Sequence, residues 1–248
     1  MIEFKLTKDL AKDLAILPKK QSEQAPSRMA ASVGAMVWYA HRVTIGRRKC
    51  IIAMESQSRY AMVFCGLTQA TFANFPKMFK ERLWCEACAV TQLKKPLPAG
   101  EVSLISGLAL EFCQQIEFSR HTDRSVQSHI RQVKEQLFYM VNDDNEPLPL
   151  TDEDAIRFGL SVNRTLRKCK GDVEYFVPLE VFRDFWLGRV QQVLGKPIKT
   201  CEKVKKGSTV KESTVKEKEN KTKKAVKEAT DMLGDTVIKV DFINRCKK

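Results

Sequence analysis

Apolar and polar positions alternate in the first part of the chain, and after Leu67 the spacing becomes helical. Ile2-Glu-Phe-Lys-Leu6 alternates strictly and predicts a strand, after which Thr7 is placed to cap a short helix ending before Pro18. Three further runs rich in β-branched and aromatic residues are separated by short turn-forming stretches: 38–45, 50–54 and 60–65. Such connections predict an antiparallel meander.

The helical part of the pattern predicts five helices. One face of the first is apolar through Phe72, Phe75, Phe79, Leu83 and Val90. A second falls around 104–112, and a third starts near Arg124 with an apolar row of Val126, Ile130, Val133, Leu137 and Val141. Thr151 opens the fourth, and Pro178 the fifth. With a possible strand at 172–177, the sum is an α+β fold, a small antiparallel sheet followed by a helical layer.

Composition fits this picture. The chain has 248 residues, of which 43% are hydrophobic and 29% charged, as in soluble globular proteins. The net charge is +13, and residues 196–248 carry 16 Lys and Arg against 8 Asp and Glu. We therefore expect a single α+β domain over 1–195 and a flexible basic C-terminal tail, with nucleic acid or another polyanion as a possible partner.

The tail divides into two parts. Ser208-Thr-Val-Lys-Glu212 repeats at once as Ser213-Thr-Val-Lys-Glu217, and the Lys-rich stretch 196–235 has too little apolar surface to fold. We expect it to be a disordered linker. Residues 236–248 contain the strand-like Val237–Ile243, which is either a docking segment for a protein partner or a frayed end.

Eight cysteines lie mostly within apolar segments: Cys50, Cys65, Cys85, Cys88, Cys113, Cys169, Cys201 and Cys246. The first residues do not have the pattern of a signal peptide, and the longest uncharged apolar run, 29–40, is too short to span a membrane. We therefore expect free thiols, a cytoplasmic location and no contact with membranes.

Four short blocks occur in a recognisable order. They are Trp38-Tyr-Ala-His41, Arg47-Arg-Lys-Cys50, Asp123-Arg-Ser125 and Asn163-Arg-Thr165. The chain resembles an uncharacterised prokaryotic family with Trp-x-Ala, Arg-Arg-Lys-Cys, Asn-Arg-Ser and Asn-Arg-Thr blocks, although Asp123 and His41 stand where Asn is commoner. The resemblance covers about residues 1–167. It implies a shared domain and no assigned activity.

Two basic sets are candidates for binding an anion. Arg47, Arg48 and Lys49 follow Gly46 at an expected turn, where they could hold phosphate or carboxylate groups. The alternative is a charged turn that only keeps the surface soluble.

The second set lies at expected helix ends. Arg124 and Ser125 begin the third helix, whose N-terminus favours anions, while Asp123 suits an N-cap. Arg164 follows the fourth helix. Sequence does not say whether these bases converge with Arg47 and Arg48.

The sequence lacks the motifs of common metal, redox and nucleotide-binding sites. Cys85-Glu-Ala-Cys88 has no second pair, so it does not make a zinc site, and it lies late in a helix, where a redox motif is not expected. The sequence has no phosphate-binding loop, dinucleotide fingerprint or zinc-protease motif. We expect no metal and no cofactor.

Three functions remain open. The first is a non-enzymatic binding module with a basic surface for nucleic acid or another polyanion. The second is an enzyme that clamps a phosphorylated or carboxylated substrate with Arg47, Arg48 and Arg124. The third is a protein–protein adaptor that docks through Val237–Ile243. The absence of a convergent nucleophile or acid–base set favours the first.

Overall fold

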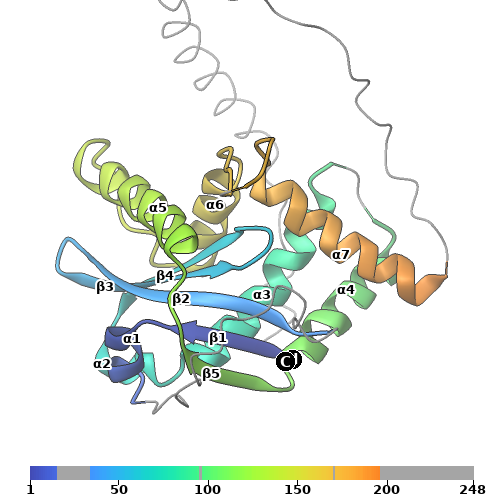
Figure 1. The fold of residues 1–248 in the computed structure, drawn as a ribbon, viewed down its shortest axis with the longest axis horizontal. Coiled ribbons are helices and arrows are strands. Elements are labelled where there is room, and N and C mark those ends of the chain that lie inside the picture. The colour runs from blue at the N-terminus through green and yellow to red at the C-terminus, as the bar shows by residue number, and fades with distance from the viewer. Residues whose placement is uncertain (16–33, 95–96, 170, 196–248) are drawn as a thin grey trace, which may run out of the picture. The chain divides into compact units, whose positions relative to one another are not determined.

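A five-stranded sheet organises the fold (Figure 1). The computed structural model describes residues 1–15, 34–94, 97–169 and 171–195. The strands are β1 (Ile2–Leu6), β2 (Met36–Ile45), β3 (Arg48–Glu55), β4 (Ala61–Leu67) and β5 (Ile116–Arg120). They lie side by side in the order β4-β3-β2-β1-β5.

The expected α+β class is confirmed, but the sheet is mixed rather than purely antiparallel. β2, β3 and β4 form the expected meander, whereas β1 runs parallel to both β2 and β5. Parallel neighbours need a long connection: residues 7–35 separate β1 from β2, and residues 7–115 separate β1 from β5. The alternation in Ile2–Leu6 predicts a strand but carries no information about its direction relative to its neighbours.

Helices cover both faces of this sheet. One core contains side chains of α3 (Phe75–Gln92), α4 (Ala99–Phe112) and α7 (Pro178–Leu194). The other contains side chains of α5 (Arg124–Asn142) and α6 (Asp152–Val162). Two short helices, α1 (Lys8–Asp13) and α2 (Gln69–Phe72), follow β1 and β4.

The first core is rich in aromatic rings. Phe79 meets Phe4 and Trp38 edge to face, at centroid distances of 4.7 and 5.0 Å. Phe182 of α7 stacks on Tyr60 at 4.1 Å. Such ring pairs add to the free energy gained by burial. The predicted apolar face is confirmed for Phe75, Phe79, Leu83 and Val90 of α3, which are fully buried. Phe72 is also fully buried, but it belongs to the separate helix α2.

The predicted apolar row of α5 packs on the second face, where Val126, Ile130, Val133 and Leu137 are buried. In Figure 1, α5 lies across β2 and β3. Two local expectations differ from the structure. β5 was not expected, and residues 172–177 form no strand but contribute one bridge between Arg167 and Phe176.

A polar network is buried between β4, α3 and α6. Tyr60 donates to Glu86 Oε2 at 2.6 Å, and Arg82 lies 3.5 Å from Glu86 Oε1. The other branch of Arg82 contacts Asp152 of α6 at 2.6 Å. Tyr60 and Glu86 are fully buried, whereas the Asp152 side chain is 78% exposed, so the network ties the helices to the sheet from the core out to the surface.

Asn163, at the C-terminal end of α6, fixes this helix to the edge of the sheet. Its amide donates to the carbonyl oxygens of Ala61 and Gly159, and its Oδ1 accepts from the Ala61 N–H, each at 2.8 Å. The side chain is fully buried. A structural role therefore accounts for the first residue of the Asn163-Arg-Thr165 block.

Three other expectations concern the thiols, contact with membranes and the C-terminal tail. The six described cysteines form no disulfide with one another, and Cys50, Cys88 and Cys113 are buried. Within the described ranges, no helix is both long enough and apolar enough to cross a membrane. The expected linker at 196–235 and the segment Val237–Ile243 lie outside the described residues.

Candidate anion-binding site

The basic trio lies at the hairpin between β2 and β3. Ile45 pairs with Arg48, which leaves Gly46 and Arg47 as a two-residue loop. Both have positive φ, 49° and 68°, as the favoured hairpin turns require. Arg47 and Arg48 are exposed and have no carboxylate partner in the described part of the chain.

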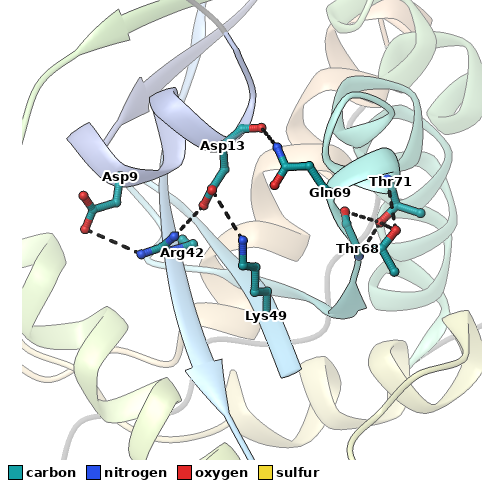
Figure 2. Close-up of polar contacts among 7 residues, drawn as sticks. All are labelled: Asp9, Asp13, Arg42, Lys49, Thr68, Gln69 and Thr71. Carbon is teal, nitrogen blue, oxygen red and sulfur yellow. Dashed lines mark hydrogen bonds and ion pairs between the residues drawn. The ribbon is translucent and has the colours of Figure 1, made fainter. Parts of the chain in front are cut away.

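Lys49 belongs instead to a structural ion-pair group. Its Nζ lies 3.5 Å from Asp13 and 5.5 Å from the centre of the Phe72 ring. Figure 2 shows that Arg42 reaches the same Asp13, at 2.8 Å, while Gln69 donates to the Asp13 carbonyl. These contacts hold α1 against β2 and α2. The charge of Lys49 is therefore already matched within the protein.

Arg124 and Ser125 begin α5, as predicted. Asp123 is confirmed as the N-cap, with Oδ1 accepting from the N–H groups of Ser125 at 2.7 Å and Val126 at 3.2 Å. Arg124 points to solvent, whereas Ser125 is half-buried. Arg164 is exposed and lines a shallow groove of about 320 Å³ between α3 and α7.

The structure does not bring the hairpin bases to the start of α5. Arg48 begins β3, whereas Ser125 lies beside Arg59, in the turn that follows the other end of this strand. An eight-residue strand spans roughly 23 Å at 3.3 Å per residue. Of the predicted candidates, Ser125 alone enters the buried cluster described next.

Arg59 is held in place by the turn between β3 and β4. The carboxylate of Glu55 accepts hydrogen bonds from the backbone of Gln57 at 3.0 Å and of Ser58 at 2.6 Å, and from the Ser58 hydroxyl at 2.7 Å. This turn gives Arg59 a φ of 59°. Its side chain is thereby directed toward α5 rather than into solvent.

The Arg59 guanidinium is buried against two potential partners. Its Nε donates to Cys169 Sγ at 3.2 Å, and its Nη2 lies 3.5 Å from Ser125 Oγ. The residue is 8% exposed, and its buried Nη1 has no hydrogen-bond partner. A buried donor without a partner is costly, so this group is suited to a ligand.

Arg167 is the second buried arginine of the cluster, and it contacts the backbone of Arg59. Its Nη1 donates to the Arg59 carbonyl at 2.5 Å, and its buried Nε has no partner. Paired backbone hydrogen bonds of 2.9 Å to Phe176 fix its position, and it is 2% exposed. Burial and the neighbouring Arg59 charge lower the pKa of Arg167 to about 10, so it stays charged at neutral pH.

His129 completes the cluster from the second turn of α5. Burial lowers its pKa to about 4, and the charges of Arg167 and Arg59 act in the same direction. The imidazole is therefore neutral at pH 7, with a buried Nδ1 that lacks a partner. Tyr39 is half-buried, and the Arg59 charge acts on it. Burial and Asp123 raise the pKa of Tyr39 to about 12, so its phenol is also neutral.

The cluster of Arg59, Arg167, Ser125, His129 and Cys169 thus carries unmatched positive charge. Neither arginine has a carboxylate within 4.0 Å among the residues that the structure describes. Buried charges in proteins are normally paired. Asp123, whose charge acts on His129, already uses Oδ1 to cap α5. An anion with several acceptor oxygens fits this arrangement, since guanidinium groups bind phosphate and carboxylate in bidentate fashion.

Sequence reasoning missed four of these five residues. Arg59 and Arg167 are 108 positions apart, and only Arg167 lies among other bases, between Arg164 and Lys168. The weak local signal for Arg59 was its position in a tight polar turn between two apolar strands. The spacing of His129 on α5 suggested a core-edge histidine, which agrees with its burial but not with its charged neighbours.

Residues 3–181 match the model of a protein family described as a domain of unknown function (DUF6933), and the chain belongs to this family. The expected membership of an uncharacterised family is thereby confirmed. The matched range includes every residue of the buried cluster. No curated protein matches the chain.

Proposed function

We propose that the domain is a non-enzymatic binding module that holds an anionic group against Arg59, Arg167 and the start of α5. The group is a phosphate or a carboxylate, carried by nucleic acid or another polyanion. The observation that carries this proposal is the burial of two arginines whose charges have no carboxylate partner in the described ranges.

Electrostatics supports an anion over a neutral ligand. Arg59 Nη1 and Arg167 Nε are donors without partners, and Ser125 Oγ adds a hydroxyl beside them. A low-dielectric surrounding strengthens each charge-assisted hydrogen bond. The neutral His129 adds no further positive charge to the cluster.

The exposed hairpin extends the proposal to a polyanion. Arg47 and Arg48 are solvent-facing and have no acidic partner in the described part, so they can contact further phosphates. Because they lie far from Arg59 along β3, one compact ligand does not reach both sites. A long polyanion would use the hairpin for affinity and the buried cluster for a specific group.

An enzyme acting on a phosphorylated or carboxylated substrate is the second candidate. One observation favours it: the Cys169 sulfur lies in the same cluster as the two arginines. An adaptor role through Val237–Ile243 concerns residues outside the described part, and no contact supports it.

A phosphate titration of the full chain tests the proposal. Inorganic phosphate should raise the unfolding temperature at constant ionic strength, because a ligand at 100 times its Kd stabilises by about 2.7 kcal/mol. Arg59→Gln should remove the effect. Arg157→Gln is the matched control, since Arg157 is an exposed arginine that pairs with Glu153 on α6.

Two results would contradict the proposal. One is equal stabilisation by phosphate and by chloride at matched ionic strength in the unchanged protein. The other is retention of phosphate binding in a folded Arg59→Gln variant. Ser125→Ala, which removes one half-buried hydroxyl, provides a milder variant if Arg59→Gln does not fold, and should weaken phosphate binding severalfold.

A further inference from the structure

Cys169 has an environment that differs from those of other described thiols. Its Sγ is half-buried and accepts the Nε–H of Arg59 at 3.2 Å. Cys50 instead contacts a backbone oxygen, and Cys88 contacts the hydroxyl of Ser106. Cys169 therefore has a cationic donor at its sulfur, and only 8% of this donor residue is exposed.

The backbone fixes the position of this thiol. The Cys169 N–H donates to Asp172 Oδ2 at 3.1 Å, and the Asp172 N–H donates back to the Cys169 carbonyl at 3.1 Å. On the other side, Arg167 is bridged to Phe176. These contacts hold Cys169 with its sulfur against Arg59.

The sulfur of cysteine is a nucleophile, and here it lies against the Arg59 guanidinium. The unpartnered Arg59 Nη1 and Arg167 Nε belong to the same buried cluster, so a negatively charged molecule drawn to them arrives beside Cys169. Proximity of this kind speeds a bond-forming step.

We propose that Cys169 is a nucleophile that bonds covalently to a small anionic electrophile held by Arg59 and Arg167. This inference rests on the proposed anion site. In the step, the thiol proton has passed to water, and the thiolate attacks an electrophilic carbon. The S–C bond forms with the sulfur electron pair, the bond from carbon to its leaving group breaks, and the leaving group departs as an anion.

Iodoacetate and iodoacetamide are a matched pair of probes. Both transfer a two-carbon group with loss of iodide, and they differ in the negative charge of the carboxylate. The full, unmodified chain is treated with each, and alkylation of every cysteine is followed over time by peptide mass spectrometry. The half-buried Cys65 and Cys85 in the same chain serve as internal references for the preference between the two probes. Absolute rates are compared with Cys85, because the contact with Cys50 raises the pKa of Cys65.

We expect Cys169 to be alkylated first by iodoacetate. Its iodoacetate-to-iodoacetamide rate ratio should exceed that of Cys65 by at least tenfold. Arg59→Gln should lower the ratio to that of Cys65, Arg59→Lys should preserve part of it, and Arg157→Gln should leave it unchanged. Inorganic phosphate should slow alkylation of Cys169 but not of Cys65.

The outcomes separate this inference from the proposed function. If phosphate binds but Cys169 reacts no faster than Cys85, the nucleophile is excluded and the binding module stands. If Cys169 reacts quickly without preference for iodoacetate and phosphate does not protect it, both the anionic electrophile and the anion site are excluded. The rate ratio in the unchanged protein distinguishes these outcomes even where a variant fails to fold.

Discussion

The phenol of Tyr60 donates a hydrogen bond of 2.6 Å to Glu86, and neither side chain has any exposure to solvent. Burial raises the pKa of Glu86 to about 7, although Arg82 and the Tyr60 hydroxyl act in the opposite direction. The hydrogen bond and the Glu86 charge both favour the neutral phenol, and with burial they raise the pKa of Tyr60 well above its ordinary value.

This pair predicts a pH-dependent stability. An unfolded chain releases the Glu86 proton near pH 4.5, whereas the folded protein keeps it up to about pH 7. The free energy of unfolding therefore falls as pH rises through this window, by about 3 kcal/mol at most from this group. Glu86→Gln should lose that part of the pH dependence. Urea unfolding at several pH values measures it, and parallel curves for the two proteins would exclude the assignment.

Replacing the buried amide of Asn163 should strongly lower the free energy of unfolding. Asn163→Ala removes three hydrogen bonds of 2.8 Å and leaves the backbone groups of Ala61 without these partners, so a loss of about 3 kcal/mol or more is expected. The exposed neighbour provides the control, because Arg164→Ala should change stability by no more than about 0.5 kcal/mol. Similar losses for both variants, measured by chemical unfolding, would contradict the role of Asn163.

Replacing Asp123 by alanine should lower stability but raise the affinity for an anion. Asp123→Ala removes the cap of α5 and should cost about 1 kcal/mol. The same change removes a negative charge that acts on His129 of the cluster, so phosphate should bind more tightly. Asp123→Asn separates the two effects, since it can keep the cap while losing the charge. Weaker phosphate binding by Asp123→Asn would argue against the electrostatic account.

The two exposed arginines of the β2–β3 hairpin should contribute to the salt dependence of polyanion binding. Arg47→Ala with Arg48→Ala should leave the fold stable to within about 0.5 kcal/mol, because both side chains are exposed. The double variant should reduce the salt dependence of binding to DNA, RNA or heparin by about 0.9 for each phosphate that it no longer neutralises. If the unchanged protein ignores all three polyanions at low salt, the polyanion part of the proposed function is wrong.

We expect a chain truncated after Gly195 to remain folded. All twelve helices and strands of the described part end before this position, and Gly195 ends α7 with a φ of 61°. The unfolding transition should remain cooperative and shift by a few degrees at most. A loss of several kcal/mol would mean that residues after 195, such as Val237–Ile243, contribute to the fold.

Patterns in the sequence identified the elements whose character is local. The apolar rows of α3 and α5 were predicted correctly because the face of a helix follows from its own spacing. β5 was missed because Ile116–Arg120 is short, carries three polar residues and lies at the sheet edge. The direction of β1 depends on partners more than thirty residues away, and no local pattern encodes it.

The candidate site shows the same limit. Asp123 and Ser125 could be predicted because a helix start has a recognisable composition. Arg59 and Arg167 could not, because their importance comes from burial and from a missing counter-charge. Both properties exist only after β4, α5 and the segment following α6 have come together.

The place of β1 between β2 and β5 also bears on the order of folding. Strands β2 to β4 are neighbours in sequence, so their meander requires no residue beyond 67. β1 is made first, yet it gains its second partner only when Arg120 is available, and closing so long a loop is slow. Until then one edge of β1 is open to pairing with other chains. Folding in dilute solution should therefore show a fast phase for the meander and a later, slower phase for β5.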